Sequence, residues 1–163
     1  MSPDTPEQHA LLFPKLSDTH LAEMRRTSIL RQTVRAEILF DRETQRPGVF
    51  IVISGSIEIV GVVNSKEAVL SVLGPGEFTG ELTQLSDRRT LVSCRVLEPG
   101  DVLEVKRDAL RLIMQTDAVM GNIFLSAFVQ RRTYLVANAV GGGRRHRVCS
   151  LKRHVAAAIF PWA

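Results

Sequence analysis

The feature that most constrains this chain is a series of short apolar runs, rich in β-branched residues, between residues 38 and 105. The runs cover residues 38–40, 49–53, 56–60, 69–73, 91–96 and 102–105. Turn signals separate them, notably Ser54-Gly55, Gly74-Pro75-Gly76 and Pro99-Gly100. Several short strands divided in this way predict a mainly β sandwich, roll or barrel.

Helical patterns flank the β region on both sides. Ser17 is a good N-cap for a short helix over about residues 19–26. After Val105 the pattern predicts a helix over 107–114 and then a longer one that Asp117 caps and that ends near Asn138. The long helix has an apolar stripe that we interpret as core. Because the stripe is wide, we also expect this helix to form a homodimer, with Phe124, Phe128 and Leu135 at the interface.

The chain of 163 residues has room for one domain. We expect a disordered N-terminus over 1–11, a folded domain over 12–140 and a basic, Gly-rich tail over 141–163. Five of the 21 Lys and Arg and none of the 17 Asp and Glu lie in that tail, so residues 1–140 carry a net charge of −1. The folded part therefore lacks the basic excess that is typical of a nucleic-acid-binding domain.

The sequence gives no sign of a membrane or of secretion. No run reaches the roughly 18 apolar residues of a membrane span. The first residues lack the basic start and apolar run of a secretory signal. We therefore expect a cytoplasmic protein.

Residues for catalysis or metal binding are scarce. Cys94 and Cys149 make neither a disulfide framework nor a zinc site. The four histidines all lie outside the β region, which excludes a metal-holding β-roll of the cupin kind. No nucleophile is paired with a base. We expect no enzyme activity, no metal and no cofactor.

The segment over residues 73–90 is the best candidate for a site. A Gly-rich turn leads into Gly80-Glu81-Leu82, and Arg88, Arg89 and Thr90 follow. Backbone N–H groups at the start of a short helix, together with an arginine, can hold a phosphate. A carboxylate such as Glu81 can accept a hydrogen bond from a ribose hydroxyl. The alternative is a salt bridge between Glu81 and Arg89 that braces a loop, with Arg88 as a surface charge.

This segment resembles the phosphate-binding cassette of the cyclic-nucleotide-binding domain family, which includes the catabolite-activator proteins. Residues 36–40, 49–60 and 96–105 resemble strands of the same domain, and the resemblance covers about residues 12–138. It implies a β-roll, also described as a double-stranded β-helix or jelly roll, with an N-terminal helix and C-terminal helices. The family also often dimerises through its last helix.

The resemblance implies a ligand-sensing regulatory domain that binds cyclic AMP or cyclic GMP. Glu81 would bind the ribose 2′-hydroxyl and Arg89 the cyclic phosphate. Gly80, Leu82 and Thr90 would line the cassette. The base would lie under the last helix, near Arg131 or Tyr134, without an assigned contact.

Two departures from the family pattern keep a second function open. Arg89 follows Glu81 by only eight positions, and Thr90-Leu91-Val92 stands where small residues are expected. A Thr directly after the Arg is associated in the family with cyclic GMP. The alternative is a regulatory or dimerisation module that does not bind nucleotide.

The region from Gly80 to Arg132 resembles most a domain that is fused in bacteria to thioredoxin-reductase-like flavoproteins, so the alternative module could be a detached part of such a protein. The 23 residues after Val140 are too few for a helix-turn-helix. We therefore do not expect DNA binding by this chain alone.

Overall fold

The computed structural model describes residues 6–42, 44, 47–63, 65–80, 85 and 89–140. Two helices precede the strands: α1 (Pro6–Leu12) and α2 (Asp18–Thr27). Two helices follow them: α3 (Arg107–Thr116) and α4 (Ala118–Val140). The strands are β1 (Ile29–Gln32), β2 (Ile38–Phe40), β3 (Val49–Val52), β4 (Ser56–Val63), β5 (Lys66–Leu73), β6 (Ser93–Glu98) and β7 (Asp101–Val105).

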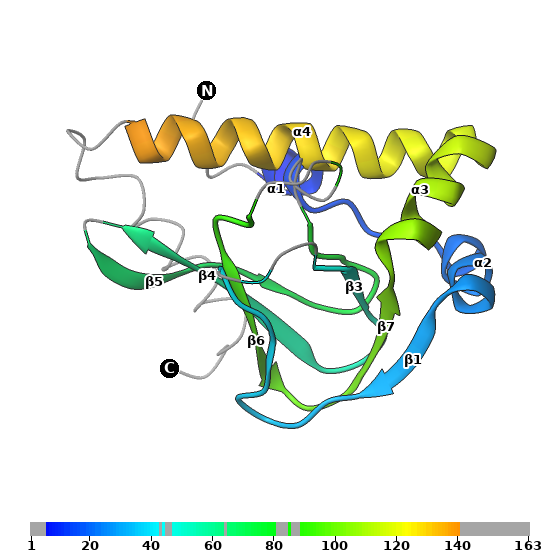
Figure 1. Cartoon of the computed structure of the whole chain (residues 1–163), viewed down its shortest axis with the longest axis horizontal. Helices are drawn as coiled ribbons and strands as arrows, with labels where there is room; N and C mark the ends of the chain where they lie inside the picture. Colours follow the sequence, from blue (N-terminus) through cyan, green and yellow to red (C-terminus); the bar gives the residue numbers. More distant parts are fainter. Residues whose placement is uncertain are drawn as a thin grey trace.

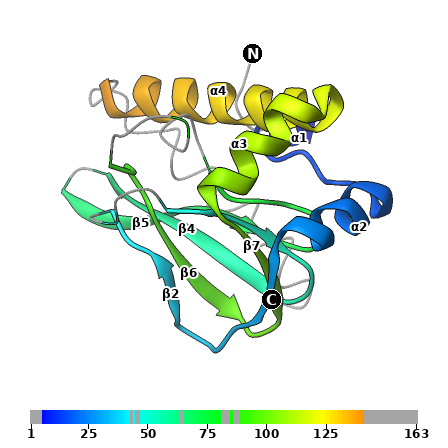
Figure 2. The same cartoon turned by 45° about the vertical axis from the view of Figure 1, so that its right-hand side comes forward.

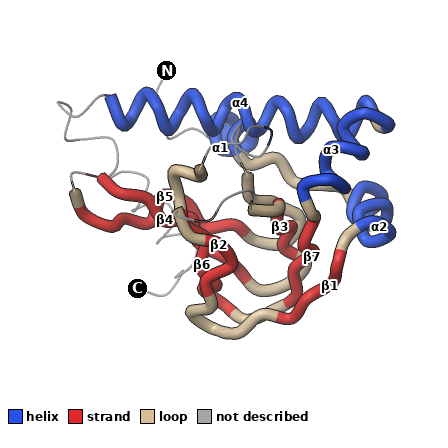
Figure 3. The backbone as a smooth tube through the Cα atoms, viewed as in Figure 1, coloured by secondary structure: helices blue, strands red, loops and turns tan. Residues whose placement is uncertain are grey.

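The strands form two antiparallel sheets that together make a roll. One sheet has the order β1-β7-β3 and the other the order β2-β6-β4-β5. Helix α4 lies across one end of the roll, with α1 close beneath it (Figures 1 and 2). Strands gather below the helices, and short loops join the two sheets (Figure 3). The predicted mainly β roll with flanking helices is confirmed.

A tight crossing of two turns closes the end of the roll away from α4. An added Cβ at Gly100 would lie 2.1 Å from the carbonyl oxygen of Ser54, and Gly55 has a φ of +75°. The Thr33 hydroxyl donates to the Gly100 carbonyl at 2.9 Å. Only glycine fits at Gly100, because any side chain would overlap the backbone of the other turn.

Two apolar clusters fill the interior. The first lies between the β3-β7 sheet and the helices, and it includes Met24, Phe78, Leu110, Phe124 and Phe128. The second lies between the two sheets, and it includes Phe40, Phe50, Leu73 and Cys94. Neighbouring residues of a strand point to opposite faces of the sheet. The buried apolar residues of the strands therefore contribute to both clusters.

The apolar stripe of α4 belongs to the core. Phe124 and Phe128 are both fully buried. Their rings lie 4.8 and 6.4 Å from the ring of Phe78. The expectation that these two rings form a dimer interface is therefore wrong, because the roll already covers them. Among the described side chains of α4, the large apolar ones that are exposed are Val119, Leu125, Val129 and Val136.

The other helix predictions hold, apart from the N-terminus. Ser17 caps α2 by accepting from the backbone N–H of His20 at 3.3 Å. Asp117 caps α4 by accepting from the N–H groups of Val119 and Met120, both at 3.0 Å. Helix α1 begins at Pro6, where the sequence predicts disorder over 1–11, and residues 1–5 of that range lie outside the described residues. The helix packs against α4, a contact that the polar local sequence does not reveal.

Candidate functional site

The backbone of residues 74–79 is attached to strand β3. The N–H of Gly76 donates to the Val52 carbonyl, and the N–H of Val52 donates to the Glu77 carbonyl, both at 2.9 Å. Thr79 exchanges two hydrogen bonds with Phe50, one through its N–H and one through its hydroxyl, both at 2.9 Å. This attachment fixes the start of the predicted cassette relative to the roll.

Gly80 and Thr90 mark the two ends of the cassette loop. Gly80 has a φ of +111°, a conformation that favours glycine. Thr90 is buried, and its hydroxyl donates to the Val92 carbonyl at 3.2 Å. Both residues line one cavity. The structure therefore brings together two of the predicted site residues that are ten positions apart.

The other predicted site residues are Glu81, Leu82 and Arg89. Glu81 and Leu82 lie outside the described residues, as does Arg88. Arg89 is exposed and is not part of the cavity lining. The assignment of the phosphate to Arg89 stays a prediction.

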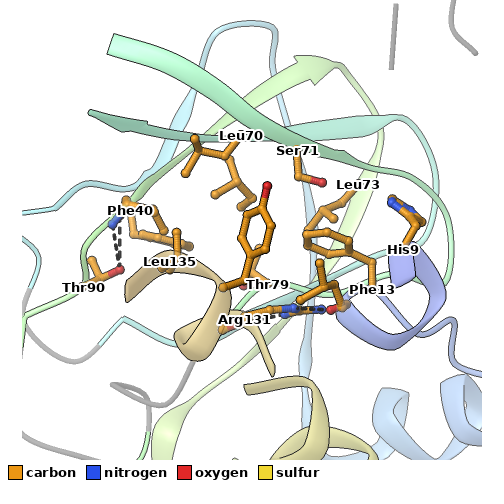
Figure 4. A pocket seen from close by; sticks show the side chains of 15 residues that line it. His9, Phe13, Phe40, Leu70, Ser71, Leu73, Thr79, Thr90, Arg131 and Leu135 are labelled. Carbon is orange, nitrogen blue, oxygen red and sulfur yellow. Dashed lines mark hydrogen bonds between the residues drawn. The ribbon is translucent and has the colours of Figure 1, made fainter. Parts of the chain in front are cut away.

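The cavity lies between the roll, α1 and the C-terminal half of α4. Its walls come from Leu12 and Phe13 of the α1 end, Phe40 of β2, Ile59 of β4, Leu70, Ser71 and Leu73 of β5, Thr79, Gly80, Thr90 and Val92 around the cassette, and Arg131, Tyr134 and Leu135 of α4, with His9 at one side. Leu70 and Ser71 face Arg131 across the space (Figure 4). Most of the lining is apolar, so the cavity suits a ligand with an apolar or aromatic part.

The cavity volume is about 70 Å³. Its walls belong to α1, α4, the roll and the two ends of the cassette loop, so a ligand bound there would contact all of them.

Arg131 is the charged residue at the centre of the described site. Its Nε donates to the Leu12 carbonyl at 2.6 Å, and its Nη1 donates to the Gly80 carbonyl at 2.8 Å. Its guanidinium carbon lies 5.0 Å from the ring centre of Phe13 and 4.7 Å from that of Phe78. One side chain therefore connects α4, the end of α1 and the start of the cassette.

The environment of Arg131 is short of negative charge. Burial lowers the pKa of Arg131 to about 9, and the negative charge of Glu77 opposes this shift only in part. The Glu77 carboxylate accepts from the N–H of Gly74 at 2.8 Å and lies 3.5 Å from His9 Nε2. Its oxygens are thus committed to the turn and to α1.

Sequence reasoning placed Arg131 near the ligand but gave it no role. The signal was present in the spacing, since position 131 continues the buried face of Phe124, Ala127 and Phe128 at intervals of seven, four and three. An arginine on the buried face of a helix needs partners that compensate its buried charge, so its position alone indicates a specific role.

Other kinds of site find no support in the part of the chain that the structure describes. Those residues contain no group of three or more His, Cys, Asp or Glu that could hold a metal ion. None of the described helices has the length and apolarity needed to cross a membrane.

Comparisons with known proteins fit this geometry. The sequence profile described as the cyclic nucleotide-binding domain matches residues 30–117. The potassium channel KAT1 of rice is 28% identical over 130 residues, which are 76% of this chain and 17% of the channel. The chain thus spans less than a fifth of the length of this relative.

Solved structures share the fold. The catabolite activator protein of Thermus thermophilus matches with a TM-score of 0.62 and 19% identity, over 79% of this chain and 61% of that one. The regulatory domain of Toxoplasma gondii PKA, solved with cAMP, matches with a TM-score of 0.52 and 23% identity, over 63% and 40% of the two chains. At these identities the likeness shows the fold alone.

Proposed function

The chain belongs to the cyclic nucleotide-binding domain family, and from this we propose that it is a regulatory, non-catalytic domain that senses cyclic AMP or cyclic GMP. The observation that carries the proposal is the cavity between Gly80, Thr90 and α4. Both ends of the cassette loop line it, together with the helix that covers the roll. The regulatory domain of Toxoplasma gondii PKA, which has the same fold, was solved with cAMP.

In this proposal the site residues have the roles that the family resemblance implies. Glu81 accepts a hydrogen bond from the ribose 2′-hydroxyl, Arg89 pairs with the cyclic phosphate, and Gly80, Leu82 and Thr90 line the cassette. In this proposal the nucleotide lies between α4 and β5, which both line the cavity. A change in the position of α4 on binding is the step by which the signal is passed to a partner.

Calorimetry with cyclic AMP and cyclic GMP tests the proposal directly. We expect saturable binding of at least one of them and none of the parent nucleosides, which lack the phosphate. Hydrogen bonds to charged groups contribute about 1.5–3 kcal/mol, so Arg89→Ala should weaken binding by roughly tenfold to a hundredfold. Glu81→Ala should weaken it as well, and Arg88→Ala is the matched control. Equal losses for Arg88→Ala and Arg89→Ala would show that the phosphate contact is misplaced.

A domain that has lost nucleotide binding is the second candidate. Val92 is buried and lines the cavity at a place where the family pattern has small residues. In this case Glu81 and Arg89 brace the loop. Both alanine variants would then lower the stability together, and the unmodified protein would bind neither nucleotide.

We also propose that the exposed face of α4 forms a homodimer. Leu125, Val129 and Val136 are each 42% exposed and lie four and seven residues apart. That spacing is the one at which two helices pack in a coiled coil. Val129→Glu should give monomers in light scattering, whereas a protein that is monomeric at high concentration before any substitution would contradict the proposal.

A further inference from the structure

Arg131 is an unusual residue for an apolar cavity. The residue is only 6% exposed, and it lies on α4 with the rings of Phe13 and Phe78 against its guanidinium. Figure 4 shows the guanidinium at the edge of the space, beneath Thr79 and beside Phe13. Fully buried arginines are rare unless they are paired.

The hydrogen bonds of Arg131 are incomplete. The guanidinium has five N–H donors. Nε and Nη1 donate to the carbonyls of Leu12 and Gly80, but the buried Nη2 has no hydrogen-bond partner among the described residues. Carbonyl oxygens carry no full negative charge, and the Glu77 carboxylate offsets the positive charge only in part. A buried charged donor without a hydrogen-bond partner is unfavourable. A ligand acceptor that reaches Nη2 therefore contributes more to the binding free energy than one that meets a donor already satisfied.

We propose that Arg131 binds the negatively charged group of the ligand of this cavity through Nη2. The ligand is therefore an anion whose apolar or aromatic part contacts residues such as Phe40 and Leu70. The identity of this ligand rests on the proposed function: in a cyclic nucleotide, the group at Arg131 is the cyclic phosphate. Arg131 is thus a contact in addition to Arg89, which lies outside the cavity lining.

The same guanidinium also transmits the binding event. It is bonded to the last turn of α1 and to Gly80 at the start of the cassette. An anion at Nη2 completes the hydrogen bonds of a group that already joins three elements. Anion binding at Nη2 therefore also stabilises the contact of α1 with α4.

The first test measures binding by thermal shift and calorimetry on the full chain. The probes are cyclic AMP, cyclic GMP and phenyl phosphate, with benzyl alcohol as a neutral aromatic control. We expect an anion to raise the melting temperature and benzyl alcohol to have no such effect. Arg131→Met should weaken anion binding by about tenfold to a hundredfold. Arg111→Met, at an exposed arginine of α3, is the matched control and should bind as the unmodified protein does.

A second measurement covers the case in which Arg131→Met does not fold. In the unmodified protein with ¹⁵N-labelled arginine, saturating anion should shift the side-chain resonances assigned to Arg131. Unchanged Arg131 resonances at saturation, or anion binding by Arg131→Met within threefold of the unmodified protein, would overturn the proposal. So would the absence of binding by all three anions. If phenyl phosphate binds at Arg131 and neither cyclic nucleotide binds, the proposed function fails and the anion site stands.

Discussion

Replacing Phe128 by alanine tests whether the stripe of α4 is core or interface. The side chain is fully buried, and its ring lies 5.9 Å from that of Phe124 and 6.4 Å from that of Phe78. Truncation of a buried Phe to Ala costs about 3–5 kcal/mol. Aromatic pairs add about 0.5–1.5 kcal/mol beyond the buried area, which places this site near the upper end of that range.

The loss should be a large part of the total stability, because the free energy of unfolding of a domain is roughly 5–15 kcal/mol. Unfolding in guanidinium chloride, followed by far-ultraviolet circular dichroism, measures it as a lower midpoint with little change in slope. Gln130→Ala, at an exposed position of the same helix, is the control and should stay within about 0.5 kcal/mol. A loss below about 1 kcal/mol for Phe128→Ala, accompanied by dissociation of a dimer, would refute the core placement.

Three further predictions concern other parts of the chain. Gly100→Ala should destabilise the fold by about 1–3 kcal/mol in the same unfolding experiment, because the new Cβ would lie 2.1 Å from the Ser54 carbonyl oxygen. An unchanged unfolding midpoint would contradict this overlap. In a Cys149→Ser background, Cys94 should react with a thiol reagent only after unfolding, because burial raises the pKa of its thiol and keeps the reagent out. Rapid reaction of the folded protein would contradict this prediction. Residues 141–163 lie outside the described residues. Deleting them should change the free energy of unfolding by less than about 0.5 kcal/mol, since the sequence of three consecutive glycines predicts a flexible joint; a loss as large as that of a core helix would contradict this.

The strands could be predicted because their signals are local. Residues 49–53 and 102–105 are apolar runs between turn residues, and the structure pairs these two segments as β3 and β7. Strand β1 was missed because Ile29 and Leu30 are about half exposed and its pattern is weak. Its formation depends on pairing with β7, which is more than 60 residues later in the chain.

The same distinction separates the predicted from the missed site residues. Gly80 and Thr90 stand in one short segment whose order of residue types is informative by itself. The role of Arg131 depends on Leu12 and Gly80, which are 119 and 51 positions away. The helical spacing places Arg131 on the apolar face of α4. Only the assembled fold shows which groups accept its hydrogen bonds.

The bond between Arg131 and Leu12 also bears on the order of events in folding. It joins groups 119 residues apart, so closing this loop before the roll exists would lose chain entropy for one contact. We therefore expect the roll to assemble first and α1 to dock on α4 last. By the same reasoning we expect α1 to detach from the native protein at a free energy below that of global unfolding. A ligand would then enter the cavity by movement of this one helix, while the two sheets stay intact.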